Sequence, residues 1–252
     1  MPLVETEGLV LKSYDLAEAD RIVIFLTRDH GVVRGVAKGA KRPKSRFGSG
    51  LEIFSVVKLT YFQKDVLELV SVREAELQKS CFEAASNPEF LQKFSYLSDL
   101  VISFAPPHDP NETLYRLVRT CLDTAKADRA ALISLGFYFE LWLLRIGGYL
   151  PDWGRCEACR RAFTENEITS LQINFHLLCK NCTRARSDIS IRGEHREMYR
   201  SALRLPPDQF AEAVTGKEET ITELSRILRR FISQIVGREI TGERSLVMGN
   251  QG

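Results

Sequence analysis

Four cysteines, Cys156, Cys159, Cys179 and Cys182, are spaced as C-x2-C-x19-C-x2-C within one short stretch of the chain. Each Cys-x-x-Cys turn can aim two sulfurs at one point, and two such turns joined by a hairpin complete the tetrahedron that Zn²⁺ prefers. Four protein ligands leave no open position for a catalytic water. The spacing therefore predicts one structural Zn²⁺ ion in a module of about residues 154–184, in which metal binding and local folding are coupled.

Two other interpretations of these cysteines are open, namely two disulfides or four unrelated buried thiols. Disulfides need an oxidising compartment, and residues 1–14 lack the basic start, continuous apolar stretch and cleavage site of a signal peptide. No apolar run approaches the roughly 20 residues that cross a bilayer. We therefore expect a cytoplasmic protein that is not in a membrane. The two remaining cysteines, Cys81 and Cys121, are expected in the core.

A second group of residues could bind an anion. Residues 31–50 hold six basic residues and no Asp or Glu, which leaves 29 basic against 33 acidic residues in the rest of the chain. Positive charge gathered in one place is typical of a contact with a polyanion, and nucleic acid becomes the leading partner. The side chains that we expect to contact it are Arg34, Lys38, Lys41, Arg42, Lys44 and Arg46.

The composition of this basic stretch also predicts its conformation. It is interrupted by Pro43 and by glycines that include Gly35, Gly39, Gly48 and Gly50, so no regular helix or strand can run through all of it. A flexible basic loop suits a bent or single-stranded phosphate backbone, whereas the alternative is a merely solvated charged turn. Aromatic residues could add base stacking, but we favour a place in the core because small barrels need large residues inside. These aromatic residues are Phe47, Phe54, Tyr61 and Phe62.

The elements that must position these residues change type along the chain. Runs rich in Val, Ile, Leu and aromatic residues predict five strands, at residues 8–14, 21–27, 32–37, 51–62 and 66–73. Apolar residues then recur at helical spacing in residues 90–104, 114–125, 130–146 and 218–236, and a further helical pattern begins near Glu194. The sequence predicts an α+β protein. A five-stranded barrel occupies residues 1–80, and a helical domain with the inserted zinc module occupies residues 81–252.

Catalytic signatures are missing from the sequence. There is no G-x-x-x-x-G-K-[ST] phosphate loop, no G-x-S-x-G elbow and no H-E-x-x-H helix. Of the four histidines only His176 is close to the cysteines, and with four thiolates present it need not be a ligand. Arg226, Arg229 and Arg230 on the last predicted helix are expected to be solvated. We therefore expect a protein that is not an enzyme.

Several stretches resemble the RecO family of bacterial recombination mediators. Residues 7–11 and 19–23 are similar to the opening of that family, residues 35–47 to its basic loop, and residues 51–54 to the strand that follows. Residues 148–151, leading into Cys156, are similar to the approach to its zinc module. The similarity spans nearly the whole chain.

This resemblance implies that the barrel is an OB-fold that binds single- and double-stranded DNA. It implies annealing of complementary strands and, with RecR, help to RecA in displacing single-stranded DNA-binding protein. It further implies that the acidic tail of that binding protein, which ends in Phe, docks on the helical domain. The protein would then act in the cytoplasm at the nucleoid. The resemblance leaves open whether RecF is needed. Two rivals remain. One is a zinc-ribbon scaffold of the translation or transcription machinery that binds RNA or protein, and the other is a metal-dependent enzyme with an open coordination site.

Overall fold

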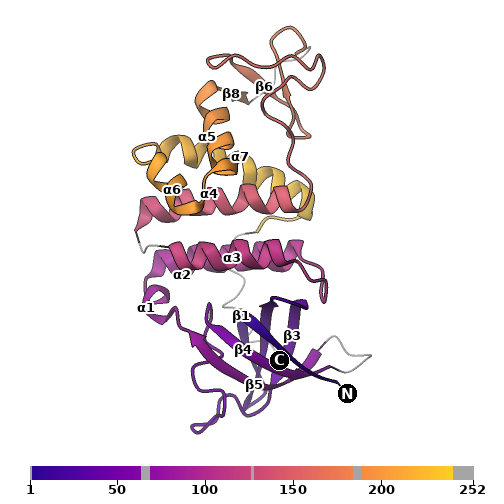
Figure 1. Ribbon diagram of the computed structural model, residues 1–252, viewed down its shortest axis with the longest axis vertical. Coiled ribbons are helices and arrows are strands. Elements are labelled where there is room, and N and C mark those ends of the chain that lie inside the picture. Colours follow the sequence, from indigo (N-terminus) through magenta and orange to yellow (C-terminus); the bar gives the residue numbers. More distant parts are fainter. Residues whose placement is uncertain (1, 64–68, 126–127, 184–188, 241–252) are drawn as a thin grey trace. The chain divides into compact units, whose positions relative to one another are not determined.

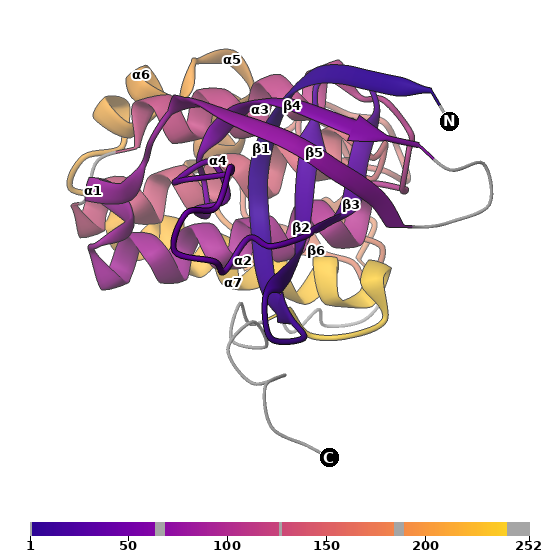
Figure 2. The same cartoon turned by 90° about the horizontal axis from the view of Figure 1, so that it is seen from below.

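The computed structural model describes residues 2–63, 69–125, 128–183 and 189–240. Its first five strands are β1 (Leu3–Leu16), β2 (Asp20–Thr27), β3 (Gly31–Ala37), β4 (Val56–Phe62) and β5 (Leu69–Lys79). They close into a barrel in the order β1-β2-β3-β5-β4, with β3 parallel to β5 and all other neighbours antiparallel (Figure 2). The predicted five-stranded, OB-like barrel is confirmed.

Strands β1 and β2 are apolar on both faces. Val10 pairs with Phe25 inside the barrel core, whereas the neighbouring pair of Leu9 and Leu26 faces the other way and is also buried. A strand that is apolar on both faces needs a cover on its outer side. Helix α2 (Pro88–Phe104) packs against β1, and its Asp99 forms an ion pair with Lys12.

Two more helices accompany α2 in this part of the chain, α1 (Phe82–Ala85) and α3 (Glu112–Thr124). The side chain of Asn87 accepts hydrogen bonds from the backbone N–H groups of Glu89 and Phe90 at the start of α2. Asn111 accepts one from the N–H of Leu114 at the start of α3. Both helices therefore begin at a polar side chain that satisfies otherwise unpaired backbone donors.

The described residues divide into two compact units, one within residues 1–127 and one within residues 128–239. The change from strand to helix falls between Lys79 and Phe82, next to the predicted division at residues 80 and 81. The compact units separate later, because α2 and α3 belong with the barrel (Figure 1). The secondary structure thus changes near the predicted division, whereas the compact units divide at residues 127 and 128, and the domain bounds stay a prediction.

The second unit contains α4 (Arg129–Ile146), α5 (Gly193–Arg204), α6 (Pro207–Ala213) and α7 (Glu218–Val236). Eleven of the 18 residues of α4 are buried, since α5, α6 and α7 all pack against it. The predicted helical part is confirmed, and the short helices α1 and α6 add to the helices that periodicity predicted. In the described part of the chain, no helix has both the length and the apolar character of a membrane span.

A small three-stranded sheet lies between α4 and α5 in the sequence. Its strands are β6 (Thr169–Leu171), β7 (Leu177–Leu178) and β8 (Ser190–Ile191), in the antiparallel order β7-β6-β8. The four predicted metal ligands flank β6 and β7. Residue 184, the last of the predicted module, lies outside the described residues.

The predicted strand at residues 51–62 starts only at Val56. Residues 51–55 form turns, with Phe54 in the left-handed region at φ 65°. This conformation is held because the N–H of Phe54 donates to the carbonyl of Val10 and its ring packs against Phe90 and Phe94 of α2. The predicted strand at residues 66–73 begins outside the described residues, and β5 continues to Lys79.

Candidate metal centre and nucleic-acid interface

The four cysteine sulfurs meet at one point of the small module. They lie within 4.8 Å of one another, and the Sγ atoms of Cys159 and Cys179 are 3.9 Å apart. Tetrahedral Zn²⁺ with Zn–S bonds of about 2.3 Å needs sulfurs about 3.8 Å apart. The cluster that the spacing predicts is confirmed, and its size fits one metal ion.

Two tight turns aim these sulfurs. The N–H of Arg160 donates to the carbonyl of Cys156 at 2.8 Å, and the N–H of Cys182 donates to the carbonyl of Cys179 at 3.0 Å. The first cysteine of each pair is buried, while Cys159 is exposed and Cys182 half-buried. Each pair therefore presents one sulfur from the inside of the module and one from its surface.

The electrostatics of the thiols favour a cation at their centre. Burial opposes ionisation of Cys156, but hydrogen bonds from the N–H groups of Cys159, Cys179 and Ala158 outweigh it and lower the pKa of its thiol to about 6. Hydrogen bonds with Cys179 and Cys159 raise the pKa of Cys182 to about 12. Thiolates gathered this closely repel one another, and a divalent cation among them removes the repulsion.

The other interpretations of the cysteines do not fit. All four are free thiols, and 3.9 Å between Cys159 and Cys179 is far above the disulfide length of about 2.05 Å. Their clustering contradicts four unrelated thiols. His176 places its Nδ1 2.9 Å from the carboxylate of Glu157, and among the described residues the group of possible metal ligands consists of the four cysteines without it. Of the two expected core cysteines, Cys121 is buried but Cys81 only half-buried.

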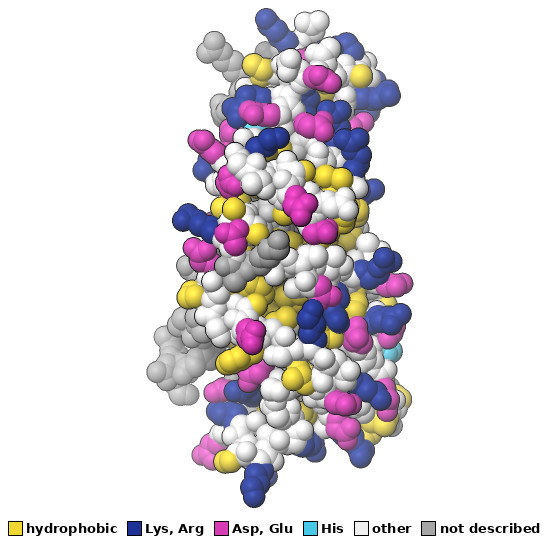
Figure 3. Space-filling view, turned by 60° about the vertical axis from the view of Figure 1, so that its left-hand side comes forward, with side chains coloured by type: hydrophobic (Ala, Val, Ile, Leu, Met, Phe, Trp, Pro, Cys, Tyr) yellow, Lys and Arg dark blue, Asp and Glu magenta, His cyan; other side chains and the backbone are white. Residues whose placement is uncertain are grey.

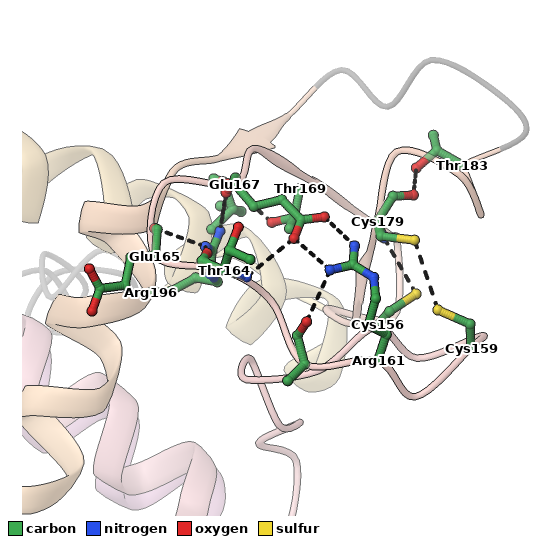
Figure 4. A network of polar contacts seen from close by, with 12 residues as sticks. Cys156, Cys159, Arg161, Thr164, Glu165, Glu167, Thr169, Cys179, Thr183 and Arg196 are labelled. Atoms are coloured by element: carbon green, nitrogen blue, oxygen red, sulfur yellow. Dashed lines mark hydrogen bonds and ion pairs between the residues drawn. The ribbon is translucent and has the colours of Figure 1, made fainter.

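Arg196 of α5 holds the segment that follows the first cysteine pair. Only 3% of this residue is exposed, and its guanidinium donates to the carbonyl oxygens of Thr164 at 2.6 Å, Glu165 at 3.1 Å and Glu167 (Figure 4). It also lies 5.3 Å from the ring centre of Phe163. Sequence reasoning missed this residue, because nothing in the local pattern distinguishes it from the other arginines of an amphipathic helix.

Arg161 connects this segment to the cysteines. Its guanidinium donates to the carboxylate of Glu167 at 2.9 Å, and hydrogen bonds with Glu167 and Cys179 raise its pKa (Figure 4). The hydrogen bond from Arg161 in turn lowers the pKa of the Glu167 carboxylate. A continuous set of polar contacts thus runs from the sulfur of Cys179 through Arg161 and Glu167 to Arg196.

Aromatic stacking attaches the module to two helices. The ring of Trp153 stacks on Tyr199 of α5, with centroids 4.4 Å apart and an interplanar angle of 14°. The ring of Phe175 stacks on Phe231 of α7 at 4.5 Å and 8°. Trp153 also donates its indole N–H to the carbonyl of Phe175. These contacts couple the metal cluster mechanically to α5 and α7.

The predicted basic loop is the connection between β3 and β4. As expected, it contains no regular helix or strand, and it consists of successive turns with backbone hydrogen bonds. Phe47 and Leu51 are buried in the barrel core, and a Cβ on Gly50 would come within 2.0 Å of the carbonyl oxygen of Ala75. The loop is therefore tied to the barrel at its middle, and we expect only its exposed tips to move.

The six predicted contact residues differ in their surroundings. Lys41 lies 3.0 Å from the carboxylate of Asp15, and Arg46 donates to the carbonyl of Val72. Arg34 is half-buried on β3. The three others are exposed and make no side-chain hydrogen bond or ion pair with the described residues; they are Lys38, Arg42 and Lys44.

The aromatic residues near the loop mostly belong to the core. Phe47, Phe54 and Tyr61 are between 1% and 3% exposed, as the core interpretation predicts. Burial accordingly raises the pKa of Tyr61 to about 12. Phe62 is different, because it is only half-buried at the end of β4.

The arginines of α7 also differ from one another. Arg229 donates to the buried carboxylate of Glu140 at 2.8 Å, so it is a structural partner rather than a solvated charge. Arg226 and Arg230 are exposed, as expected. Figure 3 shows Lys and Arg side chains interspersed with Asp and Glu on the face in view.

Comparison with known proteins gives the family. The model described as "Recombination protein O N terminal" matches residues 1–81, and the model described as "Recombination protein O C terminal" matches residues 93–244, more than half of the chain. This chain belongs to the RecO family. The predicted resemblance to this family is thereby confirmed.

Two of three RecO relatives match this chain over nearly its full length, and the third matches about two thirds of it. "DNA repair protein RecO" of Koribacter versatilis is 28% identical over 246 residues, which cover 97% of this chain and 96% of the relative. The protein of the same name from Desulforamulus reducens is 25% identical over 241 residues, 95% of this chain and 92% of the relative. That of Bifidobacterium adolescentis is 36% identical over 165 residues, 63% and 65% of the two chains. Membership places this chain among DNA repair and recombination proteins.

Proposed function

We propose that this chain is a recombination mediator that binds single- and double-stranded DNA through the β3–β4 loop and anneals complementary strands. The observation that carries the proposal is a group of three exposed cations that have no side-chain partner in the described part of the chain. They are Lys38, Arg42 and Lys44, on a loop anchored by Phe47 and Leu51. Arg34, Lys41 and Arg46 extend the same basic surface. In this proposal the barrel within residues 1–80 is the DNA-binding part, and the helical part with the module follows it from residue 81.

Annealing requires that two phosphate backbones which repel each other be neutralised while the base edges stay free to pair. Cations on a loop meet this need without reading sequence, because phosphate contacts carry position but not base identity. The proposal needs no bond-breaking chemistry and therefore no catalytic residue.

The metal ion in this proposal is one structural Zn²⁺ held by Cys156, Cys159, Cys179 and Cys182. A set of four sulfurs of this size suits zinc and leaves no position for water. Its role is to fold the module that stacks on α5 and α7. A part in DNA chemistry is not needed.

The partners in the proposal are RecR, the acidic tail of single-stranded DNA-binding protein, and through them RecA and RecF. Together with RecR the protein would promote RecA loading onto DNA coated by the single-stranded DNA-binding protein, in the cytoplasm at the nucleoid. Support comes from membership of the RecO family and from the exposed cations of the loop.

The test is the salt dependence of DNA binding by a variant without the three free cations. Replacing Lys38, Arg42 and Lys44 with Ala should flatten the slope of log K against log salt on a single strand by about 2, at about 0.7 per phosphate contact. Fluorescence anisotropy with a labelled oligo(dT) measures it. The slope for all six cations would be about 4, but Lys41 and Arg46 already have partners.

A second triple variant removes the same net charge elsewhere. Arg116, Arg129 and Lys217 are exposed, and replacing them with Ala should leave the slope unchanged. Equal slopes for the two triple variants would contradict an interface on the loop. Annealing of complementary oligonucleotides, bare and coated with single-stranded DNA-binding protein, then tests the mediator step. Preference for structured RNA would favour the zinc-ribbon scaffold instead.

A further inference from the structure

One patch on the outer surface of the barrel combines an accessible aromatic ring with arginines. Phe62 pairs with Leu3 of β1 on one side and with Ser71 of β5 on the other. Residues paired directly across strands point to the same face. The next residue, Tyr61, belongs to the barrel core together with its partner Val72, so Phe62 points outward.

A β-bulge adds a guanidinium to this face. The pairing of β4 with β5 shifts between Thr60 and Tyr61, where the partners jump from Glu74 to Val72 and leave Arg73 as the extra residue. Bulges re-aim side chains. Here the guanidinium of Arg73 lies over the ring of Phe62, 5.8 Å from its centre, and its side chain remains 53% exposed. Its ion pair with Glu74, at 3.6 Å, is long and exposed.

The neighbouring strand contributes a second arginine. Arg34 of β3 pairs with Leu69 of β5, and Val36 pairs with Ser71, so Arg34 faces the same way as Phe62. With strands about 4.8 Å apart and about 3.3 Å per residue, the Cα atoms of Arg34 and Phe62 are about 12 Å apart. The Nε of Arg34 is buried and has no hydrogen-bond partner among the described residues. The long side chain of Arg34 can span much of the distance between these two Cα atoms.

The same face also exposes apolar side chains. Leu3 is 49% exposed and Leu69 38% exposed, and both lie in the rows of Phe62 and Arg34. Among the described residues, the acidic group nearest in register apart from Glu74 is Glu5, which already pairs with Lys58 at 3.5 Å. A ring with a guanidinium above it, apolar surroundings and a nearby cation match the chemistry of an unpaired nucleotide.

We propose that Phe62 and Arg73 form a stacking platform for one unpaired base of single-stranded DNA, with Arg34 receiving a flanking phosphate. This inference rests on the proposed function and adds a base contact to the phosphate contacts of the loop. Stacking on a ring and a guanidinium tolerates any base, because every base has a π face. The platform would therefore hold an unpaired base without selecting sequence. It would release the base when pairing with a complementary strand is more favourable than stacking on the platform.

The experiment compares an intact oligo(dT) with an abasic oligonucleotide of the same length. Both present the same phosphates, but only the first has bases to stack. The change Phe62→Leu keeps apolar volume and removes the π face, and should weaken binding of the intact strand by about five- to hundredfold. Binding of the abasic strand should not change. Phe82, 65% exposed on α1, gives the control Phe82→Leu, which should alter neither affinity.

The outcomes separate this inference from the proposed function. The triple variant of Lys38, Arg42 and Lys44 should weaken both oligonucleotides alike, whereas Phe62→Leu should weaken only the intact one. Equal loss on both strands, or no loss on either, overturns the platform and leaves the loop interface standing. Failure of the unaltered protein to bind either strand overturns both. If circular dichroism shows that Phe62→Leu does not fold, Phe62→Trp serves instead. Its fluorescence should be quenched by the intact strand only, and equal quenching by the abasic strand contradicts stacking.

Discussion

Replacing Arg196 with Met should weaken metal binding although this residue is not a ligand. Its buried guanidinium donates to three carbonyl oxygens, of Thr164, Glu165 and Glu167, in the segment between the two cysteine pairs. Methionine fills much of the same volume but offers no donor. The segment then loses the contacts that place Arg161 and the sulfur of Cys179.

The size of the effect follows from these contacts. A hydrogen bond to a charged group contributes about 1.5–3 kcal/mol net, so three bonds sum to at least about 4.5 kcal/mol. Burying the guanidinium costs part of that, and the freed carbonyls can be hydrated at the surface of the module. We expect a net loss of about 3 kcal/mol. Because folding of such a module is coupled to metal binding, this loss appears as roughly 150-fold weaker zinc affinity.

Competition between the protein and a chromogenic chelator measures that affinity. Arg200 lies on the same helix with 49% of its side chain exposed and pairs with Glu197 at 2.7 Å. An exposed ion pair contributes at most about 1 kcal/mol, so Arg200→Ala should change zinc affinity less than about fivefold. Unchanged zinc affinity in Arg196→Met, with the helical signal intact, would refute the coupling between this arginine and the metal cluster.

Three further predictions concern charge. Asp15→Asn should free Lys41 from its 3.0 Å ion pair, raise DNA affinity and steepen the single-strand salt slope by about 0.7, and an unchanged slope in the anisotropy titration would contradict this. Arg229→Ala should cost about 3 kcal/mol in urea unfolding because it leaves the Glu140 carboxylate buried and unpaired, whereas replacing both by Leu should restore most of the loss. Burial lowers the pKa of His195, so the unfolded chain binds its proton more tightly and the free energy of unfolding should fall as pH drops below about 6.5. His195→Gln should remove that component of the pH profile. Parallel profiles for the unaltered protein and the variant would contradict a contribution from His195.

Much of the fold follows from patterns that act locally. Helix periodicity and strand composition predicted the longer elements, since amphipathic faces are written at fixed spacing along the chain. The cysteine spacing predicted the metal cluster because each Cys-x-x-Cys turn is also marked by a fixed spacing along the chain. The apolar residues on both faces of β1, at Leu9 and Val10, could also have indicated a helix packed outside the barrel.

The parts that sequence reasoning missed depend on partners far away in the chain. Arg73 faces Phe62 only because of a bulge, and a bulge is set by the register between two strands. Residues 51–55 look like the start of a strand, yet Phe54 takes a left-handed conformation to pack on α2. Arg196 finds its acceptors about 30 residues earlier in the chain, where no short motif marks them.

The burial of helix α4 has a consequence for synthesis. Most of its surface is apolar, but its partner α7 arrives late, as the 89-residue separation between Glu140 and Arg229 shows. At about 5–20 residues per second, a ribosome needs about 4–18 s to make that interval, and the zinc module is produced within it. We expect α4 to be exposed to chaperones during those seconds.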